Sequence, residues 1–256
     1  KKALTTDHPR YKTLGTKVGD EYIQLNTAII QIENEYYSSI RPKRLVGSGE
    51  RPINALREKG IEYVEIRALD NNIYDPFGIS DETAIFLESF LFYCLISEDQ
   101  PCDADEISKI HNNWGNVVLS GRDEDLELQL KEGSVLLRDK AAEILDAMTN
   151  FESRIGDQEY RNVFKRSLKS QRQKISDSNK TPSGKLLQEI TASGLTWDEY
   201  TNQIAKSHKE EILKSKREVH YLEEQAKESL EEFTIKEAQK EKDFDSFLAE
   251  YLSAIE

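Results

Sequence analysis

The sequence lacks the short motifs by which many nucleotide and metal sites are recognised. It contains neither the GxGxxG nor the GxxxxGK[ST] glycine loop, and its four histidines stand far apart without an HExxH-type pair. The segment TPSGK at 181–185 lacks both the first glycine and the hydroxyl after the lysine of a phosphate-binding loop. We therefore exclude a P-loop and an HExxH zinc site, and expect a loop before a helix at 181–185.

Cysteine is scarce. Cys94 lies in an apolar, helix-like run and Cys102 follows a proline, which gives neither a disulfide framework nor the CxxC spacing of metal sites. We expect both thiols to be reduced and to serve packing.

Long apolar runs are absent as well. The most apolar stretch, Ala84 to Ile96, is too short and too interrupted to span a bilayer, and the first residues lack the apolar run of a signal peptide. The net charge of −13 and the pI near 5.0 disfavour nucleic acid and anionic membranes as partners. We expect a cytoplasmic protein that binds neither.

The composition changes at about residue 80. Extended, β-branched runs with turns precede this point, and helical spacing follows it. The 256 residues suffice for one large domain or two modest ones. We therefore predict an α+β fold, with a sheet segment over residues 1–79 and a helical region over 80–256 that packs on the sheet.

Within the sheet segment, Tyr22 to Tyr37 predicts one long strand, or two strands joined by a bulge. The sequence SIRPKRLVGSGERP then reads as a basic loop, because proline and glycine break it. Pro52 to Lys59 predicts a short helix that Gly60 ends, and a strand follows over Ile61 to Ala68.

The helical region begins with a hydroxyl N-cap at Ser80, and the wide apolar face that follows is expected to pack on the sheet. Further helices are predicted over Asp105–Leu119, Val135–Phe151 and Tyr160–Gln173. From about residue 197, apolar residues at three- and four-residue steps predict one long terminal helix. It is either a solvated strut or a surface for a partner.

Two clusters of charged residues carry the chemistry. In a strand, Glu65 and Arg67 share one face, while Val64, Ile66 and Ala68 share the other, which we expect to face the core. On the strand pattern alone, an ordinary surface ion pair is the favoured interpretation of these two residues.

The second cluster is the basic RPKR segment after the polar and aromatic residues 33–37. The arginine fork and the mobile lysine charge of Arg41, Lys43 and Arg44 suit a polyphosphate, and a nearby carboxylate suits Mg²⁺. The alternative is a basic surface loop.

Together the motifs resemble a known family. QLNTAIIQIENEYYSSIRPKR, SGE, GIEYVEIRALDNNIYDPFGIS, HNNWGNVVLSGR and LELQL, from about Tyr22 to Leu130, occur in this order in the carboxy-terminal half of bacterial glutamate–cysteine ligases of the proteobacterial type. The resemblance implies a glutamine synthetase-like antiparallel sheet. It also implies ATP-dependent ligation of the γ-carboxylate of L-glutamate to L-cysteine through γ-glutamyl phosphate, the first step of glutathione synthesis.

The resemblance also assigns roles to residues. It makes Glu65 a ligand of Mg²⁺ or Mn²⁺ and places Tyr37 in the cysteine pocket. As catalytic groups it places Arg67 at the phosphoryl oxygens or the substrate carboxylate, and Arg41 at the phosphates. Near the nucleotide it places Lys43, Arg44, Tyr63 and Asn34. Simple alternation puts Asn34 on the face opposite Tyr37, so its role requires a bulge.

Complete members of this family are roughly twice as long, and their amino-terminal half supplies most of the acidic metal ligands and part of the glutamate site. The chain starts at KKALTT without methionine, which fits a start inside a longer protein. We expect the isolated chain to bind Mg-ATP weakly and to lack ligase activity without that half. The alternatives are another carboxylate–amine ligase of the same fold and a non-catalytic helical interaction module.

Overall fold

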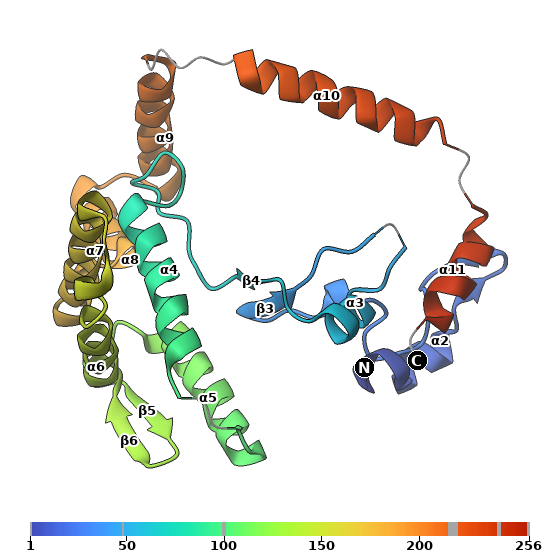
Figure 1. Ribbon diagram of the computed structural model, residues 1–256, viewed down its shortest axis with the longest axis horizontal. Helices are drawn as coiled ribbons and strands as arrows, with labels where there is room; N and C mark the ends of the chain where they lie inside the picture. Colours follow the sequence, from blue (N-terminus) through green and yellow to red (C-terminus); the bar gives the residue numbers. More distant parts are fainter. Residues whose placement is uncertain (1, 48, 99–100, 215–219, 240–241, 255–256) are drawn as a thin grey trace. The chain divides into compact units, whose positions relative to one another are not determined.

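The computed structural model describes residues 2–47, 49–98, 101–214, 220–239 and 242–254 (Figure 1). The chain forms two compact units, Lys1–Asp70 with Arg217–Glu256, and Asn71–Lys216. The described part is mostly helical and contains three antiparallel sheets of two strands each, which confirms the α+β class. No helix in these ranges has both the length and the hydropathy that a bilayer crossing requires.

The first unit combines short helices with two strand pairs. Strands β1 and β2 pair, and so do β3 and β4. The elements are α1 (Lys2–Thr5), α2 (Pro9–Leu14), β1 (Lys17–Val18), β2 (Glu21–Tyr22), the 3-10 helix η1 (Glu33–Glu35), β3 (Ile40–Lys43), α3 (Pro52–Lys59), β4 (Tyr63–Ile66), α10 (His220–Glu237) and α11 (Phe244–Ser253).

The predicted strand over Tyr22 to Tyr37 is wrong. Only its first residue lies in a strand, and residues 33–35 form η1. Between them, side-chain amides take the backbone hydrogen bonds that a sheet would use: Leu25 N donates to Gln31 Oε1 at 2.7 Å, and Ala28 N donates to Asn26 Oδ1 at 2.8 Å. Such local hydrogen bonds compete with strand pairing, so the isoleucine-rich sequence does not form the predicted strand.

The predicted basic loop is wrong over Ile40–Lys43, which form strand β3, and is confirmed over 44–47 and 49–51, which lie outside helices and strands. In β3, Arg41 lies opposite Glu65 of β4, and Pro42 lies opposite Val64. Pro42 is tolerated because β3 has one partner only within the described residues, so the proline lies in an edge strand. The predicted strand over Ile61 to Ala68 is confirmed in the shorter form of β4.

Helix α3 agrees with its prediction at both ends. Pro52 occupies its first turn, where a missing N–H is harmless, and Gly60 ends it with a φ of 76° that favours glycine. Strand β4 starts at Tyr63, three residues after this helix stop.

The second unit is a helical assembly with one hairpin. Its elements are α4 (Asp81–Ile96), α5 (Ala104–Ser120), β5 (Glu127–Leu130), β6 (Gly133–Leu136), α6 (Leu137–Thr149), the 3-10 helix η2 (Glu152–Arg154), α7 (Gln158–Ser176), the 3-10 helix η3 (Ser178–Lys180), α8 (Pro182–Ser193) and α9 (Trp197–Lys214). The expectation that only helices follow residue 80 is wrong, because β5 and β6 form a hairpin there. The helix predicted from Val135 begins later, at Leu137, since Val135 lies in β6. The other two predicted helices are confirmed as α5 and α7.

The core of the second unit lies between helices. Leu145 and Met148 of α6 meet Phe164 and Leu168 of α7, and α4 adds Ile85, Phe86, Phe90 and Tyr93 to this cluster. Figure 1 shows α4, α6 and α7 grouped in this unit. Ser80 caps α4 as predicted, with its Oγ accepting from Thr83 N at 3.2 Å. Helix α4 packs on α6 and α7, and its expected packing on the sheet stays a prediction.

Two further expectations need correction. Cys94 and Cys102 are free thiols, as predicted, but both are exposed and neither packs in a core. The single long helix from about residue 197 is wrong, since α10 ends at Glu237 and α11 begins at Phe244. Asp243 starts α11 anew by accepting from Ser246 N at 3.1 Å, which is an N-cap bond. Residues 215–219, between α9 and α10, lie outside the described residues.

The buried interface of α6 and α7 predicts a stability effect. Met148→Ala removes a fully buried side chain, so the free energy of unfolding of the second unit should fall by about 2–5 kcal/mol. Leu119→Ala is the control, because Leu119 is 86% exposed, and it should change that free energy by less than about 0.5 kcal/mol. Urea denaturation followed by circular dichroism measures both, and equal effects of the two variants would contradict this core.

Candidate functional site

The charged residues of β3 and β4 meet because of the strand register. Arg41 lies opposite Glu65 and Lys43 lies opposite Tyr63, so the basic segment and the acidic strand face each other across one ladder. Arg67 continues β4, where its backbone N donates to Ser39 O at 2.7 Å. We call Arg41, Lys43, Glu65 and Arg67 the strand-pair cluster.

Glu65 is the centre of the strand-pair cluster. Its Oε1 lies 3.2 Å from Arg67 Nε, which confirms that the two residues share a face, and its Oε2 lies 3.6 Å from Lys43 Nζ. The hydrogen bond from Arg67 lowers the pKa of Glu65 below its ordinary value, and the charges of Arg67, Lys43 and Arg41 act in the same direction. The carboxylate is therefore ionised at neutral pH.

Arg41 and Arg67 are held differently. Arg41 is only 8% exposed, and its Nη2 donates to the backbone oxygen of Glu33 at 3.3 Å. Arg67 is more accessible, with its guanidinium carbon 5.5 Å from the ring centroid of Tyr37. Of the two arginines beside this carboxylate, Arg41 is thus fixed and Arg67 is partly open.

The remaining predicted residues lie around the cluster to different degrees. Tyr63 is 44% exposed on β4, and Tyr37 is 79% exposed. Asn34 lies in η1, which replaces the bulge that its role required. Arg44 turns to Glu62, at 3.6 Å, and to the backbone oxygen of Lys59, so the structure does not bring it into the strand-pair cluster. The roles given to all these residues stay predictions.

The apolar face predicted for β4 is less buried than expected. Val64 is 40% exposed and Ile66 is half-buried, and neither belongs to the buried core of the described residues. The first unit is therefore open on the side of these residues.

Glu65 fits one ligand of a divalent metal ion. Its Oε2 is covered from solvent yet accepts no hydrogen bond from the described residues, and a carboxylate oxygen is a preferred ligand of Mg²⁺. The same residues contain no group of three histidine, cysteine or acidic side chains that could hold a metal. Glu65 by itself is thus an incomplete metal site.

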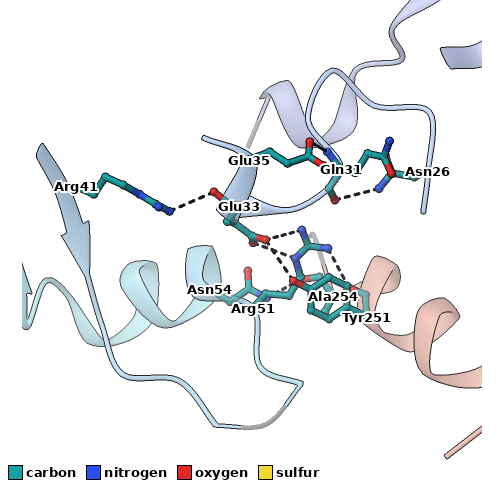
Figure 2. Close-up of polar contacts among 9 residues, drawn as sticks. All are labelled: Asn26, Gln31, Glu33, Glu35, Arg41, Arg51, Asn54, Tyr251 and Ala254. Carbon is teal, nitrogen blue, oxygen red and sulfur yellow. Dashed lines mark hydrogen bonds and ion pairs between the residues drawn. The ribbon is translucent and has the colours of Figure 1, made fainter. Parts of the chain in front are cut away.

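A buried ion pair beside the cluster escaped the sequence analysis. Arg51 donates through Nε to Glu33 Oε1 at 3.0 Å and through Nη2 to Glu33 Oε2 at 2.8 Å (Figure 2). Its Nη1 donates to the backbone oxygen of Tyr251 at 3.2 Å, and its guanidinium carbon lies 4.3 Å from the ring centroid of Tyr251. We call Arg51, Glu33 and Tyr251 the anchor.

The anchor keeps its carboxylate charged despite burial. Burial raises the pKa of Glu33, but the hydrogen bonds and the charge of Arg51, with hydrogen bonds from the backbone of Glu33 itself and of Ile53, outweigh it, and the pKa is lowered overall. The Ile53 N–H belongs to the first turn of α3, where the helix dipole also favours an anion. No local pattern signals this pair, since Glu33 and Arg51 are 18 residues apart.

The chain is similar to known proteins of one kind. The family model described as glutamate-cysteine ligase matches residues 1–117. A protein of Pseudomonas paraeruginosa named glutamate–cysteine ligase is 36% identical over all of this chain and 49% of its own length. One of the same name from Alcanivorax borkumensis is 36% identical over 97% of this chain and 49% of its own length.

A solved structure agrees. The crystal structure of glutamate–cysteine ligase from Francisella tularensis in complex with AMP matches with a TM-score of 0.86 and 31% identity, over 98% of this chain and 50% of that one. All these relatives are named as ligases. The chain belongs to the glutamate–cysteine ligase family, and it spans about half the length of the relatives that it matches.

The ion pairs of Glu65 predict its titration. The folded-state pKa is depressed, so the ion pairs stabilise the fold above the ordinary value of 4.5 and are lost as pH falls through the lowered pKa. Carbon-13 NMR should show a midpoint below 4.5, and Arg67→Gln should move it upward. Arg44→Gln is the control, since Arg44 pairs with Glu62. A midpoint that ignores Arg67→Gln would contradict the geometry.

Proposed function

We propose that this chain is a carboxy-terminal portion of an enzyme that joins L-glutamate to L-cysteine at the expense of ATP, the first step of glutathione synthesis. The observation that carries the proposal is the match over the whole chain to proteins named glutamate–cysteine ligase, at 36% identity. The strand-pair cluster supports it, because it lies within the residues that the family model matches.

The proposed nucleotide is ATP, and the related structure that contains AMP supports it. Arg41 and Lys43 would contact its phosphates, because an arginine fork and a lysine charge together suit a polyanion. Tyr63, Asn34 and, less directly, Arg44 would lie near the rest of the nucleotide. Arg44 is the weakest of these, since Glu62 and the Lys59 carbonyl already engage its guanidinium.

The proposed reaction has two steps. An oxygen of the glutamate γ-carboxylate attacks the γ-phosphorus of ATP, which gives γ-glutamyl phosphate and ADP. The cysteine amine then attacks the acyl carbon, phosphate leaves, and the nitrogen loses a proton. Both steps place negative charge on phosphoryl and carbonyl oxygens, and fixed cations stabilise such charge. Arg67, beside Glu65, and Arg41, held by Glu33, would supply them.

A divalent ion would complete the charge balance. Glu65 would hold Mg²⁺ or Mn²⁺, which would neutralise phosphoryl oxygens when bound. The covered Oε2 of Glu65 supports this role. Because the described residues offer no group of three metal ligands, the remaining ligands would come from the other half of the enzyme.

The same half would complete the fold. We propose that β3 and β4 belong to a glutamine synthetase-like antiparallel sheet whose other strands lie outside this chain. The residues over 1–79 would then line the ATP, metal and cysteine sites, and the helical residues over 80–256 would support them in a cytoplasmic enzyme. The exposed Val64 supports this arrangement, because a half-open sheet face needs a cover. Alone, the chain would bind Mg-ATP weakly and would not ligate.

Replacing the proposed metal ligand tests the site. In the whole enzyme, Glu65→Gln keeps the shape of the side chain and removes its charge, so turnover should fall by about two orders of magnitude or more while the melting temperature changes little. Glu58→Gln is the matched control, because Glu58 is an exposed residue of α3. Steady-state kinetics measures both variants, and near wild-type turnover of Glu65→Gln would remove Glu65 from the metal site.

Amine specificity tests the function itself. Cysteine or 2-aminobutyrate should stimulate ATP turnover by the whole enzyme, and Tyr37→Ala should raise the KM for cysteine about tenfold with little effect on the KM for ATP. Tyr36→Ala is the control, because Tyr36 is a neighbouring exposed tyrosine without a proposed role. Stimulation by other amines alone would indicate a different carboxylate–amine ligase.

The second candidate is a helical interaction module. Helix α10 supports it, because all its described residues are exposed, including Leu222 at 60%, Leu230 at 66% and Phe233 at 60%. The same amine assay separates the two candidates, since an interaction module would show no amine-dependent ATP turnover.

A further inference from the structure

We infer that Arg51 is a positioning residue for Arg41, and that α11 thereby belongs to the architecture of the candidate site. The inference rests on the proposed function for its kinetic consequence. Its structural basis is a continuous chain of contacts from α11 through Arg51 and Glu33 to Arg41 (Figure 2).

The first link joins Arg51 to Glu33. The Arg51 side chain is 0% exposed and the Glu33 side chain is 11% exposed, and two parallel hydrogen bonds connect them. This geometry fixes the orientation of the carboxylate as well as its distance, which a single contact would not do. Since η1 contains only three residues, fixing the side chain of Glu33 also restrains the backbone of this turn.

The second link joins Glu33 to Arg41. The backbone oxygen of Glu33 accepts from Arg41 Nη2 at 3.3 Å, while its carboxylate binds Arg51. One residue therefore holds both arginines, with its main chain and with its side chain. Because the guanidinium is planar, an acceptor on one of its nitrogens limits where the other donors of Arg41 can point.

The third link brings α11 to the start of α3. Arg51 donates to the backbone oxygen of Tyr251, and Asn54 Nδ2 donates to that of Ala254 at 2.6 Å. The last carbonyls of a helix lack partners within the helix, so these donors satisfy them from outside. Leu248 is buried on the same helix, at 5% exposure. Figure 2 shows Arg51 between Glu33 and the end of α11.

Lysine cannot replace Arg51 in this arrangement. The guanidinium serves two carboxylate oxygens, one carbonyl oxygen and the face of the Tyr251 ring at once. A lysine ammonium is a single point charge without the planar fork, so it loses the paired geometry and keeps the charge. Arg51→Lys therefore separates positioning from charge.

The test is a double-mutant cycle in the whole enzyme. Arg51→Lys should lower kcat/KM for ATP about tenfold, because Arg41 is displaced. In an Arg41→Ala background the same substitution should cause no further loss, since two residues that act through one contact are not additive. Arg172→Lys is the matched control, because Arg172 forms an exposed pair with Asp146 at 2.6 Å, and it should retain full kcat/KM.

Two outcomes would overturn the inference. One is a tenfold loss from Arg51→Lys that persists in the Arg41→Ala background, since Arg51 would then act on the fold alone. The other is a crystal structure of the Arg51→Lys enzyme in which Arg41 Nη2 still donates to the Glu33 oxygen. The two proposals can fail separately. If the unmodified enzyme did not ligate, the proposed function would be refuted. The position of Arg41 in the crystal structure of the Arg51→Lys enzyme would still decide this inference.

Discussion

The buried pair of Arg51 and Glu33 is the interaction on which the first unit depends. Removing one partner of such a pair leaves an uncompensated buried charge, which typically costs about 3–5 kcal/mol. Here the pair joins three segments: η1 with Glu33, the start of α3 with Arg51, and the end of α11 with Tyr251. Residues about 200 positions apart are thus held at one point, and the backbone that holds Arg41 is part of it.

The anchor is linked to the candidate site through Arg41 and the register of its strand. The ladder of β3 and β4 sets Arg41 opposite Glu65, and Lys43 and Arg67 bind the two oxygens of the same carboxylate. A carboxylate with a lowered pKa among cations suits a site for metal and phosphate, because each added charge finds a counter-charge in place. The anchor and the ladder together account for both the position and the charge state of the cluster.

The predictions that succeeded rest on local signals. Alternation placed Glu65 beside Arg67, and Gly60 marked the end of α3, because both patterns act within a few residues. The predictions that were wrong depend on contacts between residues distant in sequence, or on hydrogen bonds made by side chains. Pairing with β4 makes Ile40–Lys43 a strand despite Pro42, and amide side chains keep the run after Tyr22 out of a sheet. The anchor joins residues too far apart in sequence for any local pattern to link them.

We propose that the strand-pair cluster forms one wall of a metal and nucleotide site. A crystal structure of the whole enzyme with Mg²⁺ and a non-hydrolysable ATP analogue tests it most directly. We expect a metal ion about 2.0–2.1 Å from an oxygen of Glu65, with nucleotide phosphates in contact with Arg41 or Lys43. A nucleotide and metal bound elsewhere, with Glu65 still paired to Arg67 and Lys43 alone, would contradict it.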